Sequence, residues 1–157
     1  MARTLEERVR HTEDILEITN LKSRYLNACD GGWDRPSHNA DVVASTFAED
    51  AWWEAQGFPR LHGREAIRDA FKTFSSQAPF AFHCVTNPLI EVDGDGAAGE
   101  WHLTEAFTDA RGNEFFAAGI YTDRFVRQEG RWLIKSLSLT YAYSGPFKDG
   151  WSRAIRR

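Results

Sequence analysis

The sequence predicts an α+β fold in which helices come first and a curved, mostly antiparallel sheet follows. Three observations lead to this prediction. Apolar residues recur at helical spacing near the start of the chain, long strand-like runs follow Pro79, and the turns between those runs are rich in Gly, Asn and Asp. A curled meander with helices on one face forms a cone-shaped half-barrel around a cavity. We expect one domain over residues 1–157.

The first helix is predicted to begin at Thr4, because Thr4 and Glu7 match the capping-box pattern. The apolar stripe that follows consists of Ile18, Leu21, Tyr25 and Cys29. The pattern is interrupted from His11 to Asp14, where the sequence allows a break in the helix. Gly31 and Gly32 then predict a left-handed C-cap, which would leave Asp30 at the negative end of the helix dipole.

Two further helices and one strand are predicted before the meander. A short helix is expected over residues 41–48, and a strand through Trp52 and Trp53. Gly63 opens a third helix, whose apolar face consists of Ile67, Ala70, Phe71 and Phe74.

The meander is predicted to contain four long antiparallel strands. These are Phe80 to Val92, Ala97 to Asp109, Glu114 to Arg127 and Arg131 to Tyr143. Apolar residues occur on both faces of these strands, which suits a sheet covered by helices inside and by a neighbouring subunit or a loop outside. We therefore expect a homo-oligomer.

Composition and charge exclude several classes of function. The net charge is −4 and basic residues cluster only in the terminal "RAIRR", so we expect no nucleic-acid partner. The sequence contains no secretory signal pattern and no apolar run near the roughly 20 residues that span a bilayer, so we expect a cytoplasmic protein without a membrane partner. Cys29 and Cys84 lack metal or redox spacing and are interpreted as reduced, packed thiols. No metal cluster or phosphate loop is visible, so no cofactor or metal is expected.

Aromatic residues are unusually frequent, with six Trp, eleven Phe and four Tyr. Core packing explains them, but so would a pocket for a flat apolar ligand, and composition leaves both open. His83 raises a similar question, because it lies within the apolar run "FAFHCV". A lone histidine on a strand is more often a satisfied core or boundary residue than a catalytic one.

The order of segments resembles the SnoaL-like branch of the NTF2-like superfamily. The segments that carry this likeness are "ITNLKSRYLNACDGGWD", "FAEDAWWEAQG", "LHGREAIRDAF", "FHCVTNPLIEVDGDGAAGEW" and "YTDRFVRQEGRWLIKS". Within the superfamily the chain is most similar to scytalone dehydratase, the bile-acid 7α-dehydratases and hexachlorocyclohexane dehydrochlorinase. The likeness implies the cone fold, a cofactor-free reaction and a trimer, with a dimer as the alternative.

The resemblance also implies a catalytic pair. Those enzymes pair an aspartate at the end of the first helix with a histidine on a barrel strand, which by position implies Asp30 and His83. Tyr25, five residues before Asp30, matches a tyrosine of the bile-acid dehydratases. Physical chemistry supports such a pair, because a carboxylate on one ring nitrogen compensates burial and leaves the other nitrogen free to accept a proton. Asp30 as a turn former and Tyr25 as a core residue are the structural alternatives.

Three other residues are candidates for contact with substrate. The period of a strand sends His102 and Glu105 to opposite faces, and Glu105 is the one expected to face the cavity. Tyr121 and Trp53 are also assigned to substrate binding, although residues of this kind more often belong to the core. His38 is interpreted as a solvated surface residue.

The predicted function is a cofactor-independent lyase, a dehydratase that acts on a small hydrophobic compound with a hydroxylated cyclic or aromatic ring. Dehydrohalogenation is disfavoured, because Tyr25 and Leu137 stand where the dehydrochlorinase has a lysine and an arginine. The alternatives are an isomerase or an aldehyde-releasing carbon–carbon lyase with the same pair, and a non-catalytic binding or assembly subunit. The tail from Trp151 to Arg157 is either a lid over the cavity or a basic end, and the lid is favoured.

Overall fold

A computed structural model describes residues 4–34 and 38–147. The helices are α1 (Leu5–Cys29), α2 (Ala40–Ser45) and α3 (Arg64–Gln77). The strands are β1 (Phe47–Ala55), β2 (Leu61–His62), β3 (Phe80–Asp93), β4 (Gly96–Thr108), β5 (Glu114–Gln128) and β6 (Arg131–Pro146). The predicted α+β order is confirmed, whereas the tail proposed as a lid lies outside the described residues.

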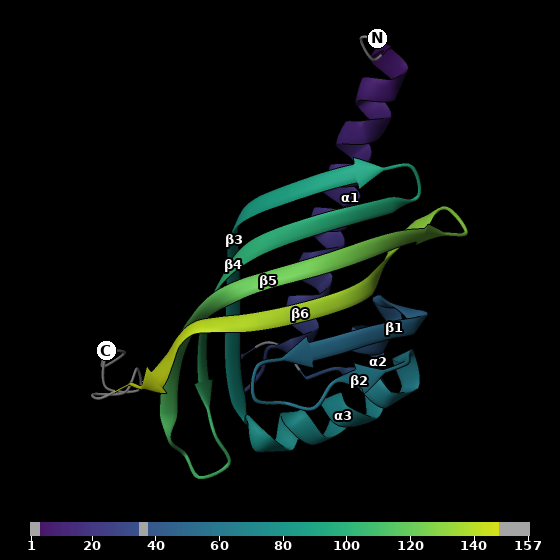
Figure 1. The fold of residues 1–157 in the computed structure, drawn as a ribbon. Helices are drawn as coiled ribbons and strands as arrows, with labels where there is room; N and C mark the ends of the chain where they lie inside the picture. Colours follow the sequence, from purple (N-terminus) through teal and green to yellow (C-terminus); the bar gives the residue numbers. More distant parts are fainter. Residues whose placement is uncertain (1–3, 35–37, 148–157) are drawn as a thin grey trace.

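The six strands form one curved sheet in the order β2-β1-β6-β5-β4-β3. All neighbours are antiparallel except β1 and β6, which are parallel. Register shifts interrupt the β3–β4 ladder between Thr86 and Leu89 and the β5–β6 ladder between Ala118 and Gly119. Such irregularities bend strands, and Figure 1 shows β3 to β6 bending together with α1 crossing behind them. The predicted curved, open sheet is confirmed.

Helix α1 is continuous, so the break allowed between His11 and Asp14 does not occur. Its start was predicted correctly, because Thr4 and Glu7 form both hydrogen bonds of the capping box. Asp14 is buried, and its Oδ1 accepts hydrogen bonds from Arg127 at 2.6 Å and from Trp132 Nε1 at 3.1 Å. These distant partners stabilise the polar segment in the helix.

The predicted left-handed C-cap of α1 is wrong. Asp30 is the C-cap and has an extended backbone, with φ −70° and ψ 152°. Gly31 then forms a two-way backbone bridge with Ala81 of β3, with both N–H···O distances at 3.0 Å. Gly32 has the positive φ, at 86°. The chain therefore leaves the helix directly onto the edge of the sheet.

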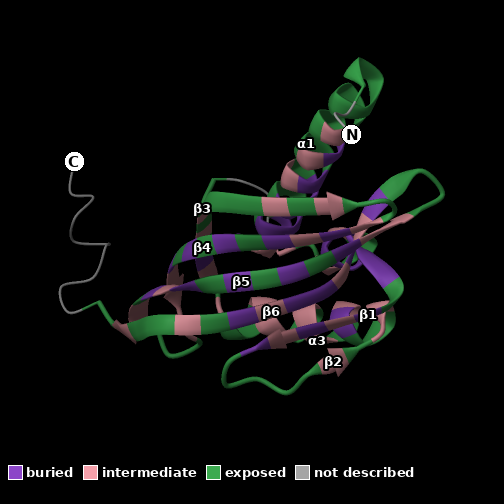
Figure 2. Ribbon diagram, turned by 45° about the horizontal axis from the view of Figure 1, so that its top comes forward, coloured by how far each residue is buried: buried purple, intermediate pink, exposed green. Residues whose placement is uncertain are grey.

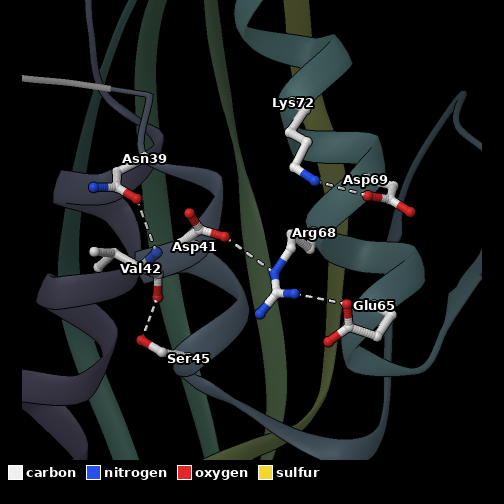
Figure 3. A network of polar contacts seen from close by, with 8 residues as sticks. All are labelled: Asn39, Asp41, Val42, Ser45, Glu65, Arg68, Asp69 and Lys72. Carbon is white, nitrogen blue, oxygen red and sulfur yellow. Dashed lines mark hydrogen bonds and ion pairs between the residues drawn. The ribbon is translucent and has the colours of Figure 1, made fainter.

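Helices α2 and α3 lie side by side (Figure 3), and both contact β1. The Asn39 side chain caps α2 by accepting a hydrogen bond from the Val42 N–H at 3.0 Å. Arg68 of α3 forms ion pairs with Asp41 at 3.1 Å and with Glu65 at 2.7 Å. Such exposed pairs contribute little to stability, so apolar contacts between the helices carry most of it. Helix α2 ends at Ser45, earlier than predicted, because β1 begins two residues later.

The hydrophobic core lies between the helices and the concave face of the sheet. Figure 2 shows buried and exposed bands alternating along β4 and β5, as the two-residue period of a strand requires. The fully buried apolar side chains of the core include Ile18, Val43, Phe47, Ile67, Ile134 and Leu137. The opposite face of the sheet carries exposed apolar side chains, among them Phe82, Phe116 and Ile120.

The close approach of Gly32 to β3 gives a test of the helix-to-sheet connection. A Cβ at Gly32 would lie 2.2 Å from the Pro79 carbonyl oxygen, in addition to the strain of a φ of +86°. Gly112 is the matched control, since its φ is +80° but nothing lies within 4 Å of the added Cβ. We expect Gly112→Ala to cost about 1–2 kcal/mol of unfolding free energy and Gly32→Ala roughly 1–3 kcal/mol more, measured by urea denaturation. Equal losses would contradict the described contact.

Candidate active site

A cavity of about 750 Å³ opens between the helices and the concave face of the sheet. This volume is in the range of small-molecule sites. The sequence-predicted residues that line it are Tyr25, Trp53, His83, Glu105 and Tyr121. Asp30 lies beside His83 at the end of α1 and is 6% exposed. The structure thus brings all six predicted residues to one region.

Asp30 and His83 are joined by two hydrogen bonds to the same carboxylate oxygen. Asp30 Oδ1 accepts the backbone N–H of His83 at 2.8 Å and lies 2.8 Å from its ring Nδ1. A carboxylate at Nδ1 favours the tautomer with its proton on that nitrogen. Nε2 is then the nitrogen with a lone pair, and the imidazole cannot rotate without losing the bond to Asp30.

A second carboxylate faces the other side of the ring. Glu105 Oε1 lies 3.5 Å from His83 Nε2, slightly beyond hydrogen-bond distance. The Tyr141 hydroxyl donates to Glu105 Oε2 at 3.3 Å. Asp30, His83, Glu105 and Tyr141 therefore form one polar network that joins the end of α1 to β3, β4 and β6, along the wall of a cavity that aromatic rings also line.

Charge and burial oppose each other at this network. Burial disfavours the imidazolium, but the hydrogen bond to Asp30 and the negative charges of Glu105 and Asp30 outweigh it, so the pKa of His83 is raised. Burial also raises the pKa values of Tyr25 and Tyr121 well above their usual range. Both hydroxyls therefore remain protonated at neutral pH and can donate hydrogen bonds.

Tyr25 is held against an aromatic wall. Its hydroxyl oxygen accepts a hydrogen bond from Trp53 Nε1 at 2.9 Å, and the same hydroxyl is hydrogen-bonded to the Cys29 thiol. The Trp53 ring in turn packs against Phe58, Phe71 and Phe74, with centroid separations of 6.1, 5.5 and 5.6 Å. These rings give the cavity a large apolar surface next to its polar network.

Two histidines outside β3 can be compared with the sequence interpretation, and one of them, His38, lies elsewhere than expected. His102 is exposed on the opposite face of β4, where its Nδ1 lies 3.2 Å from Asn87 Nδ2. His38, interpreted as a solvated surface residue, instead lines the cavity, so that interpretation is wrong. Its backbone N–H donates to the Asp30 carbonyl at 2.8 Å, and its ring packs against Gly31, where no side chain interferes.

Sequence reasoning also missed two polar features near the cavity. Tyr141 lies two residues from the predicted end of its strand, and nothing in the local pattern links it to Glu105. Lys22 and Asp123 form a fully buried ion pair with an Nζ to Oδ2 distance of 2.7 Å. One signal was available, because Lys22 follows Ile18 by four residues and therefore lies on the apolar stripe of α1.

Two kinds of feature are absent from residues 4–34 and 38–147. In that part of the chain, no group of three or more His, Cys, Asp or Glu side chains has an arrangement that could hold a metal ion. The same residues include no helix with both the length and the apolar character needed to cross a bilayer.

Comparison with known proteins assigns the chain to a family. A family model described as the SnoaL-like domain matches residues 10–138. The chain belongs to this SnoaL-like family, which has the NTF2-like fold. No curated protein matches it.

Several solved structures share this SnoaL-like fold. The hexachlorocyclohexane dehydrochlorinase LinA-type3 from Novosphingobium barchaimii is 21% identical, with a TM-score of 0.80 over 90% of this chain and 94% of that one. A scytalone dehydratase-like protein from Novosphingobium aromaticivorans is 16% identical, with a TM-score of 0.77 over 87% and 89%. A protein of unknown function from Mycobacterium tuberculosis is 28% identical, with a TM-score of 0.70 over 84% and 73%. At under 25% identity, the first two likenesses establish the fold alone.

The pKa of His83 tests the geometry of the polar network. We expect Asp30→Asn to lower this pKa and Glu105→Gln to lower it as well, because each removes a negative charge that favours the imidazolium. Glu100→Gln, on the exposed face of the same strand as Glu105, should leave it unchanged. NMR titration of the His83 ring measures all three variants.

The same pKa shift fixes the sign of a stability effect. Since the folded-state pKa is raised, the contribution of His83 to stability is complete below the unfolded pKa of about 6.5. It is lost as the pH rises through the folded-state value. A pKa of His83 that does not respond to Asp30→Asn would contradict the described hydrogen bond.

Proposed function

We propose that this SnoaL-like protein is a cofactor-independent lyase, a dehydratase that removes water from a hydroxylated cyclic or aromatic hydrophobic compound. The observation that carries the proposal is the 2.8 Å contact between Asp30 and His83 at the wall of an aromatic cavity. The fold and its dehydrochlorinase and dehydratase-like neighbours support a lyase or an isomerase in general. The choice of dehydration is our inference from the resemblance and from the chemistry of the pair.

His83 acts as the general base in this proposal. Asp30 accepts the Nδ1 proton, so the lone pair of Nε2 can remove a proton from a carbon next to a carbonyl. The carbon–oxygen bond to the hydroxyl then breaks as the carbon–carbon double bond forms. His83 returns its proton to the departing hydroxyl, which leaves as water, and the base is regenerated without a cofactor.

The remaining predicted residues bind and polarise the substrate. Tyr25 can donate a hydrogen bond to the substrate oxygen on which negative charge develops, because a thiol such as Cys29 is a weaker acceptor than that oxygen and Trp53 already donates to the hydroxyl oxygen of Tyr25. Tyr121 can act in the same way from β5, and Glu105 can hold the leaving hydroxyl near His83 Nε2. Trp53 and the neighbouring Phe rings stack against the apolar ring of the substrate.

The same pair of residues can support other reactions. Transfer of the proton to another carbon would give an isomerase, and cleavage of a carbon–carbon bond would release an aldehyde. A non-catalytic binding subunit would use the aromatic cavity alone. Dehydration is preferred because the carboxylate of Glu105, 3.5 Å from Nε2, offers a site for a hydroxyl group beside the base. A cytoplasmic location stays a prediction.

We further propose that the protein is a homo-oligomer, with a trimer favoured over a dimer. The exposed apolar side chains on the strands support this proposal. Phe82 and Phe116 are 43% and 38% exposed and flank Ala106 on the same face of the sheet. Ile120 lies on that face as well and is 39% exposed. Association of these faces would remove the rings from water.

The first prediction from the proposal concerns catalysis by His83. His83→Ala should lower kcat/KM by about 10²–10⁴-fold on an accepted substrate while the ligand affinity stays within a few-fold of wild type. His102→Ala, on the opposite face of the sheet, is the control and should keep full activity. A panel of hydroxylated ring ketones, followed by mass spectrometry, provides the assay, since only a dehydratase produces loss of water.

The pH dependence of the reaction has a defined sign. The base must be neutral, so kcat/KM should rise with pH through the raised pKa of His83.

The products formed in the mass-spectrometric assay separate the alternative functions. Conversion at constant mass would favour the isomerase, and release of an aldehyde would favour the carbon–carbon lyase. Tight binding of ring compounds with no turnover in the wild type would favour the binding subunit.

The oligomer is tested by light scattering after size-exclusion chromatography. We expect a mass of three times the chain mass for the wild type and dissociation in Phe116→Glu, because a charge would be buried in the interface. Leu16→Glu is the control on α1, where Leu16 is 58% exposed and outside the sheet. A monomeric wild type would overturn the proposal.

A further inference from the structure

Lys22 and Asp123 place two charged groups inside the protein, between α1 and β5. Both residues are 0% exposed, and Lys22 Nζ donates to Asp123 Oδ2 at 2.7 Å. The other oxygen, Oδ1 of Asp123, is buried without a hydrogen-bond partner among the described residues. Removal of two ions from water costs several kcal/mol, and apolar side chains of similar volume often fill such a site at no loss of stability. Stability therefore does not explain the pair.

The Lys22 ammonium faces three aromatic rings. Its Nζ lies 3.4 Å from the ring centroid of Tyr121, 5.1 Å from that of Trp101 and 5.3 Å from that of Tyr25. Tyr25 and Tyr121 both line the cavity. The positive charge therefore lies directly behind two tyrosines of the proposed substrate site.

A cation over the face of a phenol changes its hydroxyl group. The positive charge attracts the π-electrons of the ring, and the loss of electron density makes the O–H a stronger hydrogen-bond donor. The effect is large in a buried site, where charges are poorly screened. Tyr121 and Tyr25 remain protonated because burial raises their pKa values, so both can act as donors.

Asp123 is suited to keep the lysine charged. Burial lowers the pKa of Lys22, and the charge and hydrogen bond of Asp123 act in the opposite direction. Burial raises the pKa of Asp123 to about 6, so at pH 8 its carboxylate is ionised and accepts the hydrogen bond from Lys22 Nζ. The groups that complete this environment are the thiol of Cys29 near Lys22 and the carboxylate of Glu105 near Tyr121.

We propose that Lys22 is a positioning residue of the site, a buried cation held by Asp123 behind Tyr121 and Tyr25 that strengthens their hydrogen bonds to a substrate oxygen. The inference rests on the proposed function, because that proposal assigns Tyr25 and Tyr121 to substrate binding. It adds a residue that does not line the cavity and predicts a preference for ligands with a carbonyl oxygen over apolar ligands of the same shape.

The test compares two probes that differ only in a carbonyl group, 1-tetralone and tetralin. At pH 8, the wild type should bind 1-tetralone about 3–10-fold more tightly than tetralin, as one or two hydrogen bonds predict. Lys22→Met combined with Asp123→Leu should reduce this ratio about threefold and leave the affinity for tetralin unchanged. The infrared carbonyl stretch of bound 1-tetralone should move to higher frequency in this variant, because weaker hydrogen bonds lengthen the C=O bond less.

Asp14→Leu combined with Arg127→Met is the matched control. It removes another ion pair between α1 and β5, with an Arg127 to Asp14 distance of 2.6 Å, and neither residue lines the cavity. The probe ratio and the carbonyl frequency should equal those of the wild type. If the charge-free Lys22 variant does not fold, Lys22→Gln combined with Asp123→Asn keeps a neutral hydrogen-bonded pair and should give the same loss.

The outcomes separate this inference from the proposed function. An unchanged ratio and carbonyl frequency in a folded Lys22 variant would overturn the role of Lys22 and leave the lyase proposal intact. Equal loss of affinity for both probes would assign Lys22 to structure alone. If neither probe binds the wild type, the apolar substrate site itself is wrong, and both proposals fall together.

Discussion

The rest of the site depends on the two hydrogen bonds between the Asp30 carboxylate and His83. One oxygen accepts the backbone N–H of His83 and contacts its ring, so the end of α1 and the strand β3 hold each other in place. The bridge between Gly31 and Ala81 closes the same connection through the backbone. Without this junction, the imidazole would have neither a fixed tautomer nor a fixed position at the cavity wall.

The cavity wall combines the polar network around His83 with a group of aromatic rings, and burial and charge together set the pKa values of its residues. Burial by the aromatic wall disfavours the charged imidazole, whereas Asp30 and Glu105 favour it, and the carboxylates prevail at His83. The tyrosines are affected differently, because burial keeps their protons in place. A neutral ring compound can therefore meet a proton acceptor and proton donors in one cavity, which is the arrangement that elimination requires.

The sequence predicted the elements well but the long-range contacts poorly. Strand boundaries followed from hairpin turns, which are local, so they were confirmed within about three residues. The break in α1 was wrong because Asp14 is satisfied by Arg127, over a hundred residues away. Asp30 and His83, 53 residues apart, were linked only through the family resemblance. The position of Lys22 on the apolar stripe of α1 was a signal, but its partner Asp123 on β5 has none in the local pattern, so the pair was missed.

The central claim is that His83, oriented by Asp30, removes a proton from carbon in the aromatic cavity. The most direct measurement uses a ketone without a leaving group, so that proton removal is seen alone. Deuterium incorporation next to the carbonyl of 1-tetralone in D₂O, followed by NMR, isolates this step. The account predicts incorporation above the buffer rate with the wild type, slower incorporation with Asp30→Asn and none above buffer with His83→Ala. Equal incorporation in wild type and His83→Ala would contradict it.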